Sequence, residues 1–175
     1  TGSMSVLPLL PGAELLACVP RLRRYARALV GERAAADDLV QDTLERGWAQ
    51  RAALQPGTDA RAWLFAIMHN MRIDQIRRGA LVTEPLDDDT PMPALADRST
   101  VGIQVREMDA ALRLLSEEQR AILLMVGLED MRYEEVASTL GIPVGTVMSR
   151  LARAREKLRS LMDGGARVNS LKVVK

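Results

Sequence analysis

Aromatic residues, histidine and cysteine are all scarce in this sequence. Two Trp, two Tyr and one Phe make up 3% of the 175 residues, whereas 47% are hydrophobic. This composition favours helices packed through Ala and Leu over sheets, in which aromatic and β-branched residues are enriched. One cysteine and one histidine allow no internal disulfide and are too few for an ordinary zinc site. We therefore expect an all-α cytoplasmic protein with no metal and no cofactor.

Segments that would insert into a membrane or carry catalysis are also missing. No apolar run reaches the roughly 20 residues that a membrane span needs. The apolar stretch over residues 6–19 is interrupted by two prolines and a glutamate and follows no basic segment, unlike a secretory signal. The sequence contains no glycine-rich phosphate loop, nucleophile elbow or metal-ligand cluster. We expect no membrane insertion of its own, no catalytic residues and no enzymatic activity.

The net charge of +1 conceals two basic blocks on either side of an acidic one. Residues 1–80 and 110–175 each carry +3, whereas residues 81–109 carry −5. Apolar residues recur at helical spacing in both basic blocks but not between them, where three prolines surround Asp87, Asp88 and Asp89. We predict two small helical domains joined by a flexible acidic linker. The predicted bounds are 1–3 (a cloning remnant), 10–80 (N-terminal domain), 81–104 (linker), 105–162 (C-terminal domain) and 163–175 (a frayed tail).

Helical periodicity predicts three helices in the N-terminal domain. The first spans about residues 14–30 and the second about residues 34–50. Asp59 is the predicted N-cap of the third helix. That helix is expected to end at Arg78, because Gly79 follows.

The C-terminal domain contains the most informative segment, residues 133–158. A capping box at residues 116–119 begins one helix, and a short helix follows from Tyr133. Gly141 then permits a sharp turn, and a further helix begins near Pro143. The small Ala137 allows the two helices to cross closely. This pattern is typical of a helix-turn-helix.

The second helix of this motif divides into an apolar and a polar face. Its inward residues recur at i, i+4, i+7 and i+11; they are Val147, Leu151, Ala154 and Leu158. Hydroxyl and guanidinium groups on the other face suit base edges and phosphates. The alternative is an ordinary solvated basic face.

Two further motifs lie in the N-terminal domain. Residues 37–48 predict a helix whose polar face carries Asp38, Gln41, Asp42 and Glu45. Carboxylates repel phosphate, so this face is expected to meet a basic protein surface, unless it is only a solvated acidic face. In residues 61–78 aromatic and basic residues interleave, as is typical of single-stranded DNA binding. Trp63 shares a helical stripe with Ile67 and is expected to be packed rather than to stack on bases.

The three motifs, in this order, resemble those of the bacterial extracytoplasmic-function (ECF) sigma factors, the small two-domain specificity subunits of RNA polymerase. The resemblance covers roughly residues 10–80 and 105–160. It implies that the acidic face docks on the clamp coiled coil of the largest subunit of core RNA polymerase. It also implies that the next segment opens and reads the −10 element, with Asn70 helping to capture a flipped base. The implied −10-binding residues are Arg61, Asn70, Arg72, Arg77 and Arg78.

The second helix of the helix-turn-helix would read the −35 element of the promoter. The implied −35-binding residues are Thr146, Met148, Ser149, Arg150, Arg153 and Lys157. Met148 departs from relatives that carry a basic residue there, and it offers only apolar contact, for example to a thymine methyl. The acidic run of the linker fits either a groove built for nucleic acid or a plain solubilising segment.

The resemblance also sets the expected partners. They are core RNA polymerase, at its clamp and flap regions, promoter DNA, and an anti-sigma factor that would hold the protein inactive. The predicted function is that of an alternative sigma factor, which directs promoter recognition, melting and transcription initiation. One alternative is a stand-alone helix-turn-helix regulator, which would not need the acidic helix. Another is a sigma-like decoy for an anti-sigma factor, which would not need the basic face.

Overall fold

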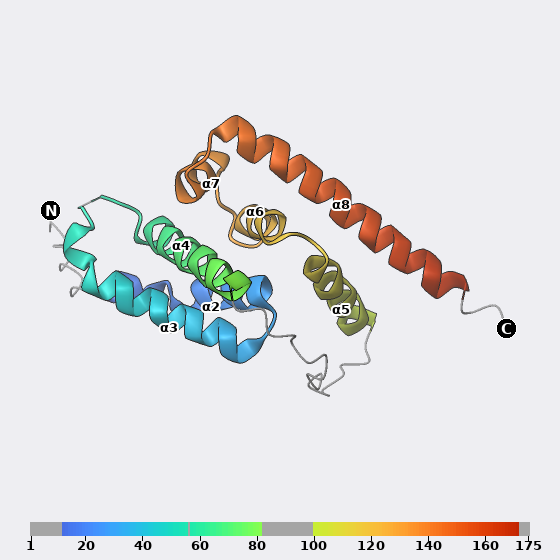
Figure 1. Cartoon of the computed structure of the whole chain (residues 1–175), viewed down its shortest axis with the longest axis horizontal. Helices are drawn as coiled ribbons and strands as arrows, with labels where there is room; N and C mark the ends of the chain where they lie inside the picture. Colours follow the sequence, from blue (N-terminus) through green and yellow to red (C-terminus); the bar gives the residue numbers. More distant parts are fainter. Residues whose placement is uncertain (1–11, 56, 82–99, 172–175) are drawn as a thin grey trace, which may run out of the picture. The chain divides into compact units, whose positions relative to one another are not determined.

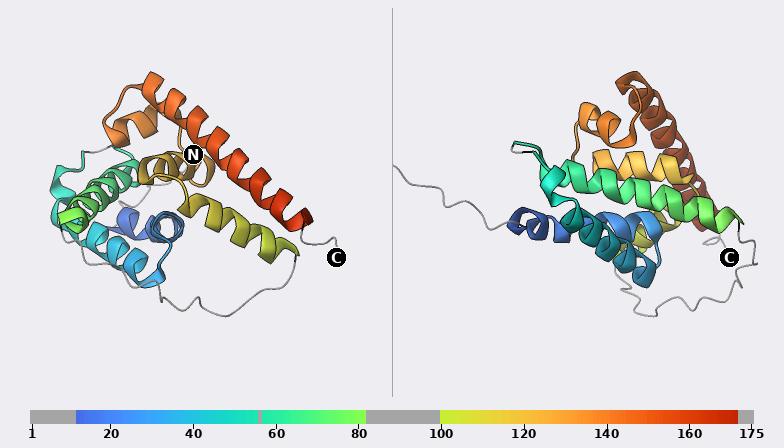
Figure 2. Two further views of the ribbon diagram at one scale, coloured as in Figure 1. Left: turned by 45° about the vertical axis from the view of Figure 1, so that its right-hand side comes forward. Right: turned by 60° about the vertical axis from the view of Figure 1, so that its left-hand side comes forward.

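The described residues form helices, and within each unit short connections join them (Figures 1 and 2). The structure is a computed structural model that describes residues 12–55, 57–81 and 100–171, and in these ranges it contains no strand. The all-α fold class is therefore confirmed. The chain divides into two compact units, unit 1 (Thr1–Ile73) and unit 2 (Asp74–Lys175). Each unit is described by itself.

The helices of unit 1 are α1 (Ala13–Ala17), α2 (Val19–Val30), α3 (Arg33–Ala49), the 3₁₀ turn η1 (Arg51–Ala53) and α4 (Ala60–Leu81), whose last residues belong to unit 2. The prediction of a single helix over residues 14–30 is wrong, since the helix is interrupted at Cys18. Pro20 lies in the first turn of α2 and has no N–H to donate to the carbonyl of Leu16, so the helical ladder is interrupted there.

The core of unit 1 holds α2, α3 and α4 together. Tyr25 and Phe65 meet edge to face, with ring centroids 4.9 Å apart, and Leu22, Leu39 and Leu64 have no exposed surface. α3 approaches α4 closely at a glycine. A Cβ added to Gly47 would lie 2.7 Å from Cδ2 of Leu64, which is closer than two non-bonded carbon atoms approach in proteins. This packing fixes which side of α3 faces solvent.

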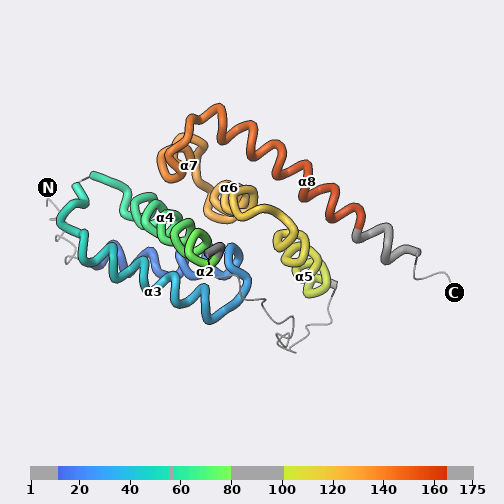
Figure 3. Tube along the Cα trace, in the orientation of Figure 1, coloured from blue at the N-terminus to red at the C-terminus, as the bar shows by residue number. Residues whose placement is uncertain are grey.

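Unit 2 contains α5 (Thr100–Arg113), α6 (Glu117–Gly127), α7 (Tyr133–Leu140) and α8 (Val144–Leu171). α6 and α7 both pack on α8, through a core that includes Ile122, Met125, Val136 and Val147, none of which has exposed surface. The trace from α6 through α7 into α8 can be followed in Figure 3. The predicted capping box is confirmed, because Ser116 and Gln119 bond reciprocally at the start of α6.

Three predicted boundaries differ from the structure. α4 runs on through Gly79 to Leu81, because a glycine inside a helix costs only about 1 kcal/mol and does not by itself end it. α5 begins at Thr100, so residues 100–104 of the predicted linker are helical. α8 continues to Leu171, so most of the predicted tail is helix, as no proline interrupts it. The rest of the predicted linker, residues 82–99, lies outside the described residues, and the domain bounds stay a prediction.

Candidate protein- and DNA-binding surfaces

The acidic face of α3 consists of Asp38, Gln41, Asp42 and Glu45, all of them exposed. The opposite side of the helix is buried, which explains why these four side chains project together into solvent. Nε2 of Gln41 donates to Oε1 of Glu45 at 3.4 Å. The start of α3 is fixed by the carboxylate of Glu32, which accepts from the backbone N–H groups of Ala34 and Ala35. The predicted polar face therefore exists on a helix that is capped and anchored.

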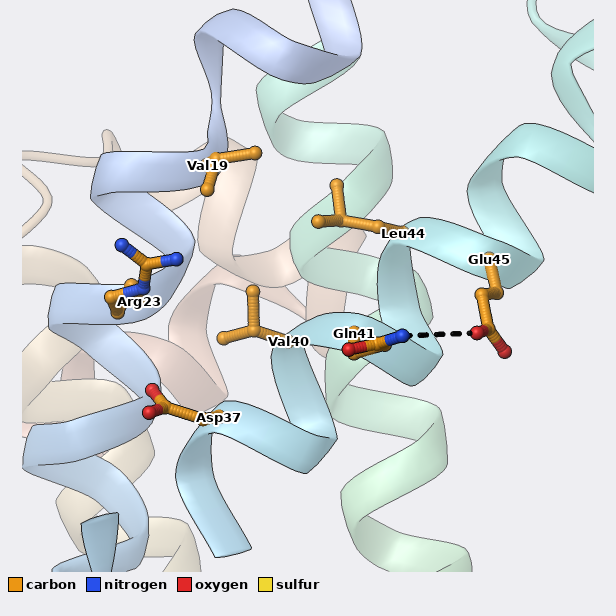
Figure 4. Close-up of a pocket in the computed structure, with 7 residues that line it drawn as sticks. All are labelled: Val19, Arg23, Asp37, Val40, Gln41, Leu44 and Glu45. Atoms are coloured by element: carbon orange, nitrogen blue, oxygen red, sulfur yellow. Dashed lines mark hydrogen bonds between the residues drawn. The ribbon is translucent and has the colours of Figure 1, made fainter. Parts of the chain in front are cut away.

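A pocket of about 340 Å³ lies beside this face, between α2 and α3 (Figure 4). Val19, Val40 and Leu44 provide its apolar part, and charged or polar side chains surround them. The lining residues are Val19, Arg23, Asp37, Val40, Gln41, Leu44 and Glu45. The contribution of α2 to this surface was not predicted. The apolar periodicity of both helices gave no indication that Val19 and Leu44 would leave a hollow between them.

The charges around this pocket are not equivalent. Nη2 of Arg27 lies 3.3 Å from Oδ1 of Asp37, so Asp37 has a cationic partner within the protein. No ion pair to Asp38, Asp42 or Glu45 exists within the described ranges. Their three negative charges are therefore available to a basic partner surface.

The predicted −10-binding residues all lie on or at the start of α4, but they do not share one face. At 100° per residue, Arg61 and Arg72 fall on the stripe of Phe65 and Met68, which faces the core. Both arginines are half-buried at the ends of this stripe. The carboxylate of Asp59 accepts from the backbone N–H of Arg61 at 3.0 Å, as expected of an N-cap. Nη2 of Arg61 also lies 3.8 Å from the same carboxylate.

The other three predicted residues of α4 face solvent. Asn70 and Arg77 are seven positions apart and lie on one exposed stripe. Arg78 is exposed beside them. Trp63 is half-buried, and its Cζ3 lies 3.6 Å from the place that a Cβ on Gly47 would take. This position supports the packing role predicted for Trp63.

The helix-turn-helix is formed by α7, a turn at Gly141 and the first part of α8. Gly141 adopts a left-handed conformation with φ of 67°, which glycine reaches without steric cost. The backbone N–H of Ile142 then donates to the carbonyl of Ala137 at 3.1 Å. Val147, Leu151 and Ala154 are buried, as predicted, and Leu158 is half-buried. The side chains on the other side of α8 are thereby fixed in direction.

The predicted −35-binding residues occupy this other side of α8. Met148, Ser149, Arg153 and Lys157 are exposed, whereas Thr146 and Arg150 are half-buried. The hydroxyl of Ser149 donates to the carbonyl of Thr146 at 3.1 Å, and Nη1 of Arg150 donates to the carboxylate of Glu118 on α6. Two further exposed arginines, Arg155 and Arg159, follow Met148 at i+7 and i+11 on its own stripe. They were not predicted, although this helical spacing was enough to find them.

The remaining chemistry of the described residues is sparse. Burial, reinforced by the charge of Asp59, raises the pKa of the Cys18 thiol, so that its reactive thiolate is disfavoured. Within residues 12–55, 57–81 and 100–171, no group of three or more His, Cys, Asp or Glu side chains is placed to hold a metal ion. In the same ranges, no helix combines the length and the apolar character of a membrane span.

Comparison with known proteins assigns both units. Residues 15–69 match the family model described as the Sigma2 domain of PhyR, and residues 106–158 match region 4 of sigma-70. The ECF RNA polymerase sigma factor EcfG of Rhodopseudomonas palustris is 38% identical over 150 residues, which span 85% of this chain and 83% of EcfG. The chain belongs to the ECF sigma factors. SigL of Mycobacterium tuberculosis is also similar to it, with 36% identity over 143 residues, 79% of this chain and 80% of SigL.

Solved structures agree with this assignment. The sigma factor RpoE of Bartonella quintana, in complex with the anti-sigma factor NepR, superposes with a TM-score of 0.71 and 33% identity over 93% of this chain and 96% of RpoE. CnrH, in complex with the cytosolic domain of CnrY, superposes with a TM-score of 0.66 and 26% identity over 87% of this chain and 87% of CnrH. The chain is thus a transcription initiation factor that gives RNA polymerase its promoter specificity, and sigma factors are not enzymes. The match over residues 15–69 accounts for the N-terminal helices that a stand-alone regulator would lack.

Proposed function

We propose that this sigma factor divides its contacts between two surfaces of opposite charge. The acidic face of α3 binds the clamp of core RNA polymerase, and the exposed faces of α4 and α8 bind promoter DNA. The observation that carries this proposal is the charge of α3, where Asp38, Asp42 and Glu45 are exposed and have no cationic partner in the described part of the chain. Such a face is repelled by nucleic acid and attracted by a basic protein surface.

The pocket beside the acidic face strengthens the case for a protein partner. Its apolar part, formed by Val19, Val40 and Leu44, lies directly next to Gln41 and Glu45 (Figure 4). Specific protein interfaces combine an apolar centre with a polar rim. An apolar side chain of the clamp fits the hollow, while basic side chains around it meet the carboxylates.

On α4, the exposed stripe of Asn70 and Arg77 supports −10 recognition. Extruding a base from the duplex costs a few kcal/mol of stacking and pairing, and the amide of Asn70 offers both donors and acceptors to the extruded base. Arg77 and Arg78 contribute contacts to the DNA backbone. Arg61 and Arg72 lie at the two ends of the core-facing stripe, and we assign them backbone contacts at the edges of the interface.

On α8, the first four turns supply the −35 contacts. Arg150 and Arg153 are the residues suited to guanine, since a guanidinium pairs with both major-groove acceptors of that base. Ser149 and Thr146 contact phosphates or base edges, and Lys157 contacts the backbone. Met148, which is 52% exposed, meets a thymine methyl.

An anti-sigma factor is part of the proposed regulation. RpoE was solved with the anti-sigma factor NepR, and it superposes on 93% of this chain. We propose that a protein of this kind holds the sigma factor inactive in the cytoplasm, and that the chain has no catalytic activity of its own.

The decisive experiment is run-off transcription with purified core polymerase. The wild-type chain is expected to confer start-site selection, and the double variant Asp38→Arg with Asp42→Arg is expected to lose it, because the charge of the docking face reverses. Core binding, measured by fluorescence anisotropy of labelled protein, should fall in parallel. The matched control is Glu14→Arg, which reverses an exposed charge on α1.

The helical circular dichroism of the double variant must equal that of the wild type, which shows that the fold is retained. Unchanged affinity for core polymerase in a correctly folded double variant would refute the docking assignment.

A further inference from the structure

Arg150 is joined to a carboxylate that lies outside the reading helix. Its Nη1 donates to Oε1 of Glu118, which is in the first turn of α6 and 32 positions earlier in the chain. The side chain of Arg150 makes no other hydrogen bond among the described residues. The side chains of Arg150 and Glu118 are 35% and 56% exposed. The pair therefore sits on the surface of unit 2, at the edge of the proposed −35 contact.

The position of Glu118 is set by the start of α6. Ser116 accepts from the backbone N–H of Gln119 at 3.2 Å, and the Gln119 side chain accepts from the backbone N–H of Ser116 at 3.3 Å. This capping box fixes the first turn of the helix. The positive end of the helix dipole also favours a carboxylate there. Glu118 is thus presented to α8 from a defined turn of a packed helix.

The two adjacent glutamates of this turn have different partners. Oε2 of Glu117 accepts from Nη1 of the buried Arg120 at 3.1 Å, and Arg120 also donates to backbone carbonyls near the end of α5. Glu117 therefore belongs to the packing of α5 on α6. Glu118 takes no part in that network. Because exposed ion pairs add only about 0–1 kcal/mol to stability, the fold alone does not explain its bond to Arg150.

We infer that Glu118 is a positioning residue that sets the DNA specificity of Arg150. This inference rests on the proposed function of α8. The guanidinium has five N–H donors, and the bond to Glu118 occupies one of them. The donors that remain are sufficient for the two acceptors on the major-groove edge of guanine. Glu118 thereby holds the side chain in one orientation while the base is read.

The same bond disfavours contacts that carry no sequence information. For Arg150 to reach a phosphate in a non-specific complex, the guanidinium must leave Glu118. The carboxylate then has no cationic partner, and the DNA backbone repels it. A specific complex keeps the bond and avoids this loss. Glu118 therefore increases the difference in affinity between the correct upstream element and any other sequence, which is how specificity is defined.

The test uses holoenzyme assembled from the full chain and core polymerase. The probe is a duplex library with a fixed −10 region and a randomised upstream segment, and the bound fraction is sequenced. With Glu118→Gln, which keeps the size of the side chain and removes its charge, the enrichment of the best upstream sequences should fall about fivefold or more. This is the low end of what one bidentate guanine contact contributes, about 1–3 kcal/mol.

A second measurement reports the contact that Arg150 is expected to make instead. On a duplex without promoter elements, the slope of log affinity against log salt should steepen by about 0.9 in the Glu118→Gln variant, the value of one added phosphate contact. The matched control is Glu134→Gln, which removes the same charge from an exposed position in the first turn of α7. The control should change neither quantity.

A double-mutant cycle with Arg150→Ala separates the possible outcomes. Glu118→Gln should have no further effect on enrichment once Arg150 is gone; an equal effect in that background would overturn the inference. If Arg150→Ala lowers the enrichment and Glu118→Gln leaves it at the wild-type level, the inference fails and the proposed function of α8 stands. If Arg150→Ala itself leaves the enrichment unchanged, the proposed −35 assignment of Arg150 fails, and the inference fails with it.

Discussion

Replacing Arg120 with methionine should destabilise unit 2 more than any surface substitution in it. Arg120 is only 8% exposed, and its guanidinium joins α6 to the end of α5. Nε donates to the carbonyl of Leu112 at 2.8 Å, and Nη2 donates to those of Leu115 at 3.0 Å and Arg113 at 3.3 Å. Nη1 completes the set with the carboxylate of Glu117. One side chain thus holds the turn between the two helices.

The magnitude follows from what each partner loses. The carbonyl of Leu112 keeps a bond from the backbone N–H of Leu115 at 3.2 Å, so it stays paired. The variant loses the bonds from Arg120 to the carbonyl of Leu115 and to the carboxylate of Glu117. These buried or half-buried acceptors are then left without that donor. Hydrogen bonds to charged groups are worth about 1.5–3 kcal/mol each. Methionine recovers part of this by burying its apolar side chain. A net loss of about 3–5 kcal/mol is expected, the range for breaking a buried ionic network.

Urea denaturation of the full chain, followed by two signals, measures this loss. Both tryptophans, Trp48 and Trp63, lie in unit 1, so tryptophan fluorescence follows that unit, whereas far-UV circular dichroism follows the helices of both. In the Arg120→Met variant, the urea midpoint of the unfolding of unit 2, which only dichroism detects, should fall. The midpoint of the fluorescence transition should stay unchanged. Arg155→Met is the control, since it removes an exposed arginine of α8 and should change stability by less than about 0.5 kcal/mol. Equal stability of the two variants would refute the reasoning.

Two further predictions concern unit 1 and α4. Gly47→Ala should destabilise unit 1 by up to about 2 kcal/mol. The new Cβ would lie 2.7 Å from Cδ2 of the buried Leu64, and overpacking costs about 1–3 kcal/mol, of which about 1 kcal/mol is offset by the higher helix propensity of alanine. The tryptophan fluorescence transition in urea measures this change, and a variant more stable than the wild type would contradict the close packing. Asn70→Ala should reduce promoter opening more than it reduces closed-complex formation, and permanganate reactivity of the −10 thymines measures the opening. Gln75→Ala is the control, at an exposed position of the same helix. Equal loss at both steps would count against base capture.

The sequence predicted those features that depend on local chemistry. The capping box of Ser116 and Gln119 needs only two side chains and the backbone between them, so its pattern is readable without a structure. The turn at Gly141 is similar, since a left-handed conformation strongly favours glycine. The buried stripe of Val147, Leu151 and Ala154 follows from helical periodicity alone.

The boundaries that were predicted wrongly depend on competition between neighbours. The apolar spacing of residues 14–30 continues across Cys18, yet Pro20 removes one donor and divides the helix into α1 and α2. At Gly79 the opposite holds, because the residues on both sides keep the helix going to Leu81. Periodicity reports which face is apolar. It says little about whether the backbone can continue.

The candidate surfaces were predicted as lists of residues, and the structure adds their arrangement. On α3 the four predicted residues do form one exposed face. On α4 the list divides, since Arg61 and Arg72 follow the core-facing stripe while Asn70 and Arg77 face solvent. The bond between Glu118 and Arg150 joins two helices and could not be foreseen, because it depends on how α6 packs on α8.

The bond between Glu118 and Arg150 also bears on how one unit carries charged groups of both signs. A carboxylate and a guanidinium that meet on one packed unit pair with each other, as Glu118 and Arg150 do in unit 2 and as Arg27 and Asp37 do in unit 1. At physiological salt such attraction acts over about 8 Å. In the part of the chain that the structure describes, Asp38, Asp42 and Glu45 take part in no such pair, so the proposed docking face keeps these charges for an external partner. A single carboxylate next to Arg150 then has a limited task, to orient one arginine without neutralising the rest of the face.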